Sequence, residues 1–173
     1  MSRAELAKAN FLKGYACAQA VLLAFSDVTG LDEGTAMKIS LPFGGGMGRL
    51  RLTCGTVSGA VAVLGMVLAG PGVDPANKRL VYGAVQEFSR RFTAENGSVI
   101  CGELLKAAGL ATDTNAVPEA RSAEYYKKRP CPDLVYSAAD ILENCLKEAG
   151  LLSSPASFGK NIAFRRSISY NIL

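Results

Sequence analysis

The sequence predicts a single all-α domain, a bundle of about six helices joined by loops rich in Gly and Pro. Apolar residues recur every three or four positions in successive segments, and no run shows sustained two-residue alternation. The chain has 173 residues, 49% hydrophobic and 20% charged, and its composition does not divide it into two domains. We expect residues 1–150 to form one domain and residues 151–173 to form an apolar arm that packs on this domain or on a partner subunit.

The N-terminal part of the chain predicts two helices followed by a glycine loop. Apolar spacing over residues 3–26 predicts one long amphipathic helix that ends near Gly30. Asp32 is suited to cap a second helix, which should end near Ser40. The segment that follows, residues 42–49, contains four glycines and cannot continue a helix at low energetic cost, so we expect it to be a loop.

The next segment, residues 53–70, consists of 18 consecutive uncharged positions, close to the shortest length that crosses a membrane. It contains Gly55, Gly59 and Gly65, lacks an aromatic belt, and is not accompanied by a second span. We therefore expect a buried core helix over residues 57–69 and no membrane span.

The second half of the chain predicts four further helices. A long amphipathic helix is expected over residues 75–95. Ser98 is suited to cap a short helix in which Cys101 would occupy the third position. Pro118 should open a short polar helix. The last helix is expected to carry its apolar stripe over residues 131–145.

Composition excludes several classes of function. The chain has no histidine, which excludes a serine-protease-type triad, histidine zinc sites and the usual haem attachment motif, so no haem is expected. The net charge is only +4, and the basic residues form no continuous stripe that could follow a phosphate backbone. We therefore expect no nucleic-acid partner.

The five cysteines are odd in number and widely spaced, and the polar N-terminus does not resemble a signal peptide. A reducing cytoplasm is therefore the expected location. Cys54, Cys101 and Cys131 lie at or just before expected helix starts, where backbone N–H groups favour a thiolate. Cys17 is expected in mid-helix among small residues. Cys145 completes the apolar stripe of the last helix and is expected to be structural.

Several short segments carry a resemblance to a known family. They are Gly14-Tyr15-Ala16-Cys17-Ala18-Gln19-Ala20-Val21, Phe43-Gly44-Gly45-Gly46-Met47-Gly48-Arg49, Cys54-Gly55-Thr56-Val57-Ser58-Gly59, Asn96-Gly97-Ser98-Val99-Ile100-Cys101-Gly102-Glu103-Leu104-Leu105 and Cys131-Pro132. In this order they resemble the C_GCAxxG_C_C family of small bacterial and archaeal redox-active proteins, over about residues 5–147. That family is also similar to the non-haem part of split-Soret cytochrome c, for which an iron–sulfur-type centre has been proposed.

The resemblance implies a functional set of four cysteines, Cys17, Cys54, Cys101 and Cys131, and leaves Cys145 outside it. It also implies a supporting role for Gly44, Gly45, Gly46, Gly48, Arg49, Gly55 and Gly59. Two residues depart from the family pattern. Thr56 stands where the Cys-Gly-Ala-x-x-Gly motif has alanine, and Ala16 stands where asparagine is common, which removes a side chain that could orient a ligand.

Three interpretations follow for the function. In the first, four convergent thiolates hold an iron–sulfur cluster, with zinc ranked second, for electron transfer, and Arg49 and Arg51 offset part of the negative charge. In the second, the cysteines form a thiol–disulfide couple or sensor without metal, with Cys131 or Cys101 as the attacking thiol. In the third, the protein is a non-catalytic helical module whose glycine loop holds a small ligand. A homodimer and an unidentified redox partner are expected in addition.

Overall fold

The computed structural model describes residues 1–152, and within them the all-α prediction is confirmed. These residues contain no β-strand, and an isolated antiparallel bridge pairs Thr53 with Ile100. The helices are α1 (Arg3–Leu12), α2 (Cys17–Leu23), α3 (Ser26–Thr29), α4 (Glu33–Ser40), α5 (Gly55–Leu68), α6 (Pro75–Asn96), α7 (Cys101–Ala107), α8 (Ala123–Lys128) and α9 (Cys131–Glu148), and a 3₁₀ turn (Leu41–Phe43) follows α4.

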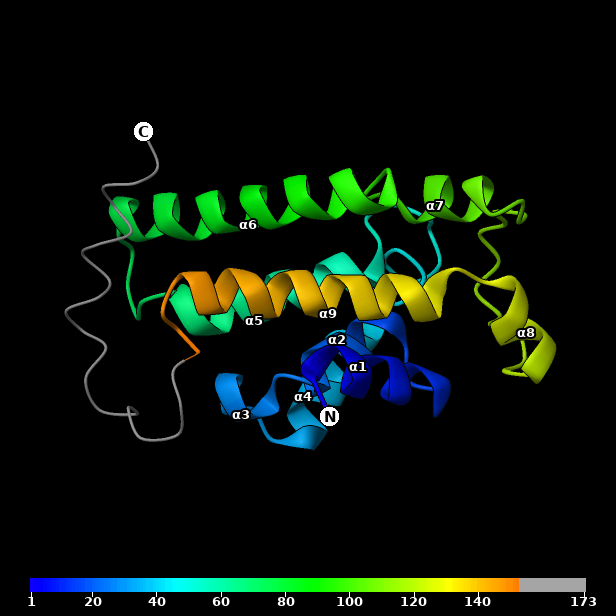
Figure 1. The fold of residues 1–173 in the computed structure, drawn as a ribbon, viewed down its shortest axis with the longest axis horizontal. Helices are drawn as coiled ribbons and strands as arrows, with labels where there is room; N and C mark the ends of the chain where they lie inside the picture. Colours follow the sequence, from blue (N-terminus) through cyan, green and yellow to red (C-terminus); the bar gives the residue numbers. More distant parts are fainter. Residues whose placement is uncertain (153–173) are drawn as a thin grey trace.

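The helices are arranged in layers, with α5 and α9 in the middle (Figure 1). The long helix α6 packs on one side of this pair, and α1 and α2 pack on the other side. The core between the layers is built on four fully buried phenylalanines, Phe11, Phe25, Phe88 and Phe92. Their burial contributes strongly to the stability of the bundle, since each large aromatic ring removes a great deal of apolar surface from water.

The prediction of one helix over residues 3–26 is wrong, because the structure divides this segment into α1, α2 and α3. Gly14 has a φ of +104°, a conformation that no helix contains and that glycine adopts without steric penalty. The chain re-enters a helix at Cys17 after this break. As a result, Cys17 is the first residue of α2 and does not lie in mid-helix as expected.

Several other boundaries follow the sequence closely. Asp32 caps α4 by accepting a hydrogen bond from the Thr35 amide at 2.9 Å, and α4 ends at Ser40 as expected. The helix expected from Pro118 begins later, after the cap residue Ser122. No helix within residues 1–152 is both long and apolar enough to cross a membrane.

The expected C-terminal arm lies almost wholly outside the described residues. Of that arm, the structure includes Leu151 and Leu152, which are half-buried and pack against the core.

Candidate functional site

A cavity of about 270 Å³ lies at the end of the molecule where α7 and α8 are found, the right-hand end in Figure 1. All four cysteines of the family set line it, namely Cys17, Cys54, Cys101 and Cys131. Cys145 does not line the cavity. It lies near the C-terminal end of α9, close to Glu148 and to Arg91 of α6. The fold therefore gathers sulfurs that are widely separated in sequence around one space.

Each of the four cysteines stands at the start of a helix. Cys17, Cys101 and Cys131 are the first residues of α2, α7 and α9, and Cys54 is the residue that precedes α5. The two longer helices, α5 and α9, direct unpaired backbone N–H groups and the positive end of their dipoles toward this region.

Backbone hydrogen bonds join the segment before α5 to the segment before α7, and so bring Cys54 and Cys101 together. The Cys101 amide donates to the Leu52 carbonyl at 2.7 Å, and the Cys54 amide donates to the Val99 carbonyl at 2.8 Å. A Cβ added at Gly46 would lie 2.8 Å from the Cβ of Cys101, which is closer than real atoms approach. The absence of a side chain at this position therefore lets the loop lie against the start of α7.

The other expected loop residues divide into two groups. Some line the cavity directly, namely Gly44, Gly45, Gly48, Arg49 and Gly55. Gly46 and Gly59 do not line it but permit close packing beside it. A Cβ at Gly59 would lie 2.7 Å from the Ala18 carbonyl oxygen, so this glycine lets α5 approach α2 next to Cys17.

Cys17 and Cys131 both line the cavity wall, and the ionisation of each thiol affects that of the other. The hydrogen bond to Cys131 and burial raise the pKa of the Cys17 thiol well above its usual value. The same hydrogen bond, helped by the positive charges of Arg129 and Arg121, lowers the pKa of Cys131 to about 7. The surroundings therefore favour ionisation of Cys131 before that of Cys17.

The surroundings act differently on the three cysteines whose positions at helix starts were expected to favour a thiolate. Burial raises the pKa of Cys54 to about 12, although its sulfur lies 3.2 Å from the hydroxyl oxygen of Thr56. Burial also raises the pKa of Cys101, with a further contribution from the charge of Cys131. Desolvation outweighs the helix N-terminus at both positions because no neighbouring cation compensates it fully.

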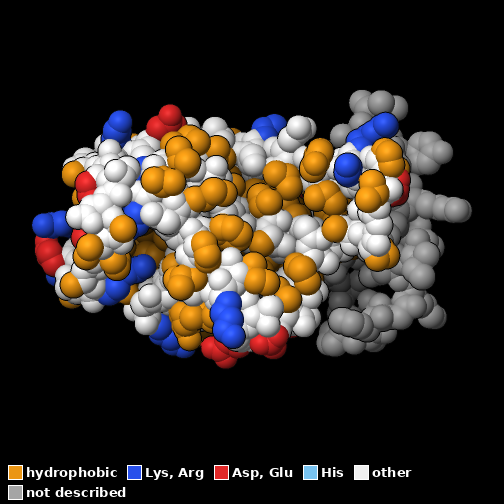
Figure 2. Space-filling view, turned by 180° about the vertical axis from the view of Figure 1, so that it is seen from behind, with side chains coloured by type: hydrophobic (Ala, Val, Ile, Leu, Met, Phe, Trp, Pro, Cys, Tyr) orange, Lys and Arg blue, Asp and Glu red, His pale blue; other side chains and the backbone are white. Residues whose placement is uncertain are grey.

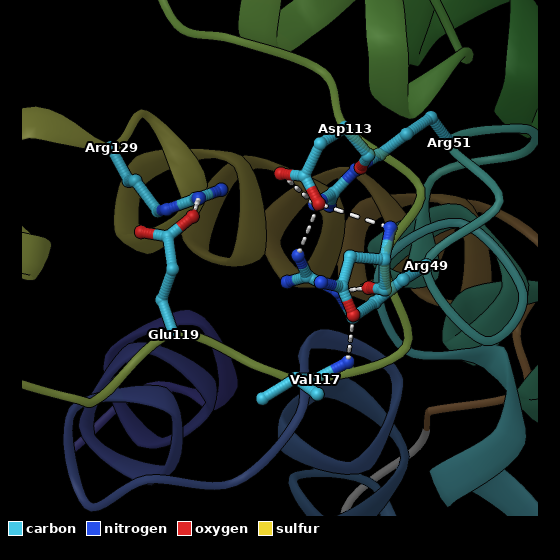
Figure 3. A network of polar contacts seen from close by, with 7 residues as sticks. Arg49, Arg51, Asp113, Val117, Glu119 and Arg129 are labelled. Carbon is cyan, nitrogen blue, oxygen red and sulfur yellow. Dashed lines mark hydrogen bonds and ion pairs between the residues drawn. The ribbon is translucent and has the colours of Figure 1, made fainter.

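Residues of the segment between α7 and α8 form hydrogen bonds and ion pairs with arginines that line the cavity (Figure 3). The Nη2 atom of Arg49 lies 3.1 Å from a carboxylate oxygen of Asp113, and the Nε atom of Arg51 donates to the Asp113 carbonyl at 2.8 Å. Arg129 pairs with Glu119 on the opposite wall. These contacts tie residues 113–119 across the mouth of the site.

Sequence reasoning missed Arg121 and Arg129. The Arg129 side chain is only 7% exposed and lines the cavity, although no role was assigned to it from the sequence. One signal was available, because Arg129 stands two residues before Cys131 at the start of a helix. An arginine so close to a helix-start cysteine favours the thiolate form.

The donor set suits a thiolate-bound metal, but the arrangement in this structure does not. Cysteine thiolates are preferred ligands of iron–sulfur clusters and zinc. Within residues 1–152, however, no three side chains of His, Cys, Asp or Glu are grouped as a bound metal ion requires. The four sulfurs would have to move closer together to bind one ion.

A comparison with sequence models of protein families gives a match over residues 15–145, well over half of the chain. The chain belongs to the C_GCAxxG_C_C family. This family is described as "Putative redox-active protein (C_GCAxxG_C_C)", and the match confirms the resemblance drawn from the cysteine and glycine motifs. All four cysteines at the cavity lie within the matched residues. Neither the curated proteins nor the solved structures contain a significant match to the chain.

Proposed function

We propose that this member of the C_GCAxxG_C_C family is a thiol–disulfide redox protein in which Cys131 is the attacking thiol and Cys17 is the resolving thiol. The observation that carries the proposal is that Cys17 and Cys131 line the same cavity, with the guanidinium groups of Arg121 and Arg129 in the same wall. A thiolate with a pKa close to the surrounding pH combines good nucleophilicity with a substantial ionised fraction, and the pKa of Cys131 is about 7.

The reaction transfers two electrons to an external disulfide. The Cys131 thiolate attacks one sulfur of that disulfide, forms a mixed disulfide and releases the other sulfur as a thiolate. Cys17 then loses its proton and attacks the sulfur of Cys131, which releases the second thiolate. The external disulfide is reduced to two thiols, and a Cys17–Cys131 disulfide is formed. The reverse sequence oxidises two external thiols.

The surroundings favour different roles for the other cysteines. Cys54 and Cys101 are buried and their pKa values are raised, so they are poor nucleophiles at neutral pH. Their hydrogen-bonded positions beside the glycine loop suit residues that shape the cavity. Cys145 lies outside the cavity and provides a natural control.

The test is to oxidise the reduced chain mildly, block the remaining thiols and identify the disulfide by peptide mass spectrometry. We expect the free-thiol count to fall by two, with Cys17 linked to Cys131. Cys131→Ser and Cys17→Ser should each prevent this loss, whereas Cys145→Ser should not. A different pairing, or a thiol count that does not change under oxidant, would contradict the proposal. Circular dichroism of each variant confirms that loss of the disulfide is not loss of the fold.

A four-thiolate iron–sulfur cluster, with zinc as a further option, is a second proposal. It is favoured by the presence of all four family cysteines around one cavity, beside arginines that would offset the negative charge. The test is anaerobic purification followed by metal analysis and an absorption spectrum, with Cys54→Ala compared with Cys145→Ala. Visible absorption that is lost only in the first variant would support the cluster. A colourless, metal-free protein with an intact thiol pair would exclude it.

The homodimeric state, the redox partner and the cytoplasmic location are parts of the same proposal. A thiol couple that cycles between two states needs a compartment that keeps the reduced form available, which the cytoplasm provides.

A further inference from the structure

The walls of the cavity carry much more positive than negative charge. Four guanidinium groups line it, whereas a single carboxylate among the lining residues, that of Glu119, is present to balance them. Asp113 adds a second negative charge beside Arg49 and Arg51. The four cationic side chains are Arg49, Arg51, Arg121 and Arg129. Figure 2 shows Lys and Arg side chains at this end of the molecule, which lies on the left in that view.

Three of these cations are largely removed from water. The side chains of Arg51 and Arg129 are each 7% exposed, and that of Arg49 is 15% exposed. Burying a cation is costly unless it is fully paired. Arg51 is not fully paired: its Nη2 atom is buried without a hydrogen-bond partner, and the nearest carboxylate oxygen, Oδ2 of Asp113, is 3.9 Å away.

Arg121 provides a further unbalanced charge. Its guanidinium lies over three aromatic rings, with its Cζ atom 4.6 Å from the ring centre of Phe11 and 4.9 Å from that of Tyr125. Among residues 1–152 it forms no ion pair with a carboxylate. The rings hold the guanidinium in place and leave its N–H groups available to an anionic ligand.

We propose, resting on the proposed function, that the disulfide accepted by Cys131 is a small molecule that carries carboxylate groups. A guanidinium binds a carboxylate through two parallel N–H···O hydrogen bonds, and Arg121 is the residue placed to form them. The remaining wall is apolar, with Leu41, Leu104 and Leu134, and suits a short aliphatic chain. The cavity volume of about 270 Å³ restricts the ligand to a small molecule.

The cavity should discriminate among small disulfides by their net charge. The positive wall attracts an anion toward a thiolate that would otherwise repel it, and this attraction weakens as salt is added. A neutral disulfide gains nothing from the wall, and a cationic disulfide is repelled. The order of reactivity should therefore be anionic, then neutral, then cationic.

The experiment measures the rate at which the reduced full chain reacts with three disulfides: 3,3′-dithiodipropionate, bis(2-hydroxyethyl) disulfide and cystamine. Each rate is divided by the rate of the same disulfide with N-acetylcysteine amide, a neutral reference thiol, to remove differences between leaving groups. We expect the anionic-to-neutral ratio to be about tenfold at low salt and to fall as salt is raised.

Arg121→Gln should lower this ratio about threefold to tenfold, whereas Arg79→Gln should leave it unchanged. Arg79 is exposed on α6, outside the cavity lining, so it controls for net charge. Arg121→Gln also raises the pKa of Cys131 and so lowers its thiolate fraction. This change affects the rates with the anionic and the neutral disulfide equally, so it cancels when one rate is divided by the other. If Arg121→Gln does not fold, the salt dependence of the native ratio is the deciding measurement.

The outcomes separate the two proposals. Equal normalised rates for the anionic and neutral disulfides, or a preference for cystamine, would overturn the anion inference while the thiol couple stands. If none of the three disulfides forms a Cys17–Cys131 bond, the thiol–disulfide function itself fails and the inference fails with it.

Discussion

Replacement of Gly59 by alanine tests the close contact between α5 and α2 that places Cys17 at the cavity. The added Cβ would lie 2.7 Å from the Ala18 carbonyl oxygen and 3.1 Å from both the Cα of Ala18 and the Cβ of Val21. Two of these atoms belong to the backbone, so a change of side-chain rotamer cannot relieve the overlap. The two helices would have to separate by a substantial fraction of an ångström.

The size of the effect follows from two opposing contributions. Alanine is favoured over glycine within a helix by up to about 1 kcal/mol. Overpacking of a tight interface costs about 1–3 kcal/mol. We therefore expect Gly59→Ala to lower the free energy of unfolding by up to about 2 kcal/mol. Separation of the helices should also speed alkylation of Cys17, which packs beside this contact.

Gly65→Ala is the matched control, because the same substitution is made in the same helix. A Cβ at Gly65 meets no atom within 4 Å, so only the gain in helix propensity is expected, about 0.5–1 kcal/mol of added stability. The assay is urea unfolding of the reduced protein followed by far-ultraviolet circular dichroism. If both variants change stability in the same direction by the same amount, the packing argument is refuted.

Three further predictions concern individual side chains. Alkylation of Cys131 should rise with pH with a midpoint near 7, since its pKa is about 7, whereas a midpoint near 9 would show that the hydrogen bond to Cys17 does not hold a thiolate. Thr56→Val should shift the alkylation of Cys54 to higher pH, because the hydroxyl 3.2 Å from its sulfur is lost, and an unchanged profile would contradict that contact. Phe92→Ala should lower the free energy of unfolding by about 3–5 kcal/mol in urea, because the ring is fully buried and stacks on Phe88, and a loss below about 1 kcal/mol would mean that this core is not as packed as described.

Helix content could be predicted from the sequence because it depends on local patterns. The spacing of apolar residues indicates α6 and α9, and a long uncharged run indicates α5. The capping role of Asp32 indicates the start of α4. The break between α1 and α2 was not predicted, since apolar residues continue through Gly14 at helical spacing. A lone glycine in such a pattern is compatible with a continuous helix, and here tertiary packing decides the outcome.

The cavity itself could be anticipated only through the family resemblance. Spacing in sequence does not reveal that Cys17 and Cys131 meet, because the contacts that bring α1 and α2 against α9 depend on the whole bundle. The position of Arg121 at the cavity could not be predicted from the sequence either, since a charged residue outside any helix belongs to no periodic pattern. Its position depends on the rings of Phe11 and Tyr125, which come from distant segments.

The four cysteines share a structural position but not a chemical environment, and this difference determines which of them can react. All four lie at helix starts, so the helix N-terminus cannot explain why Cys131 is ionised near neutral pH while Cys54 is not. The decisive differences are the hydrogen bond from Cys17 and the nearby guanidinium groups, which Cys54 lacks. A bound metal would itself deprotonate the thiols that coordinate it, so this difference concerns the metal-free protein. In that form, one activated thiol beside one protonated partner is the arrangement that disulfide exchange requires. The asymmetry of the cavity therefore makes Cys131 the thiol expected to react first when no metal is bound.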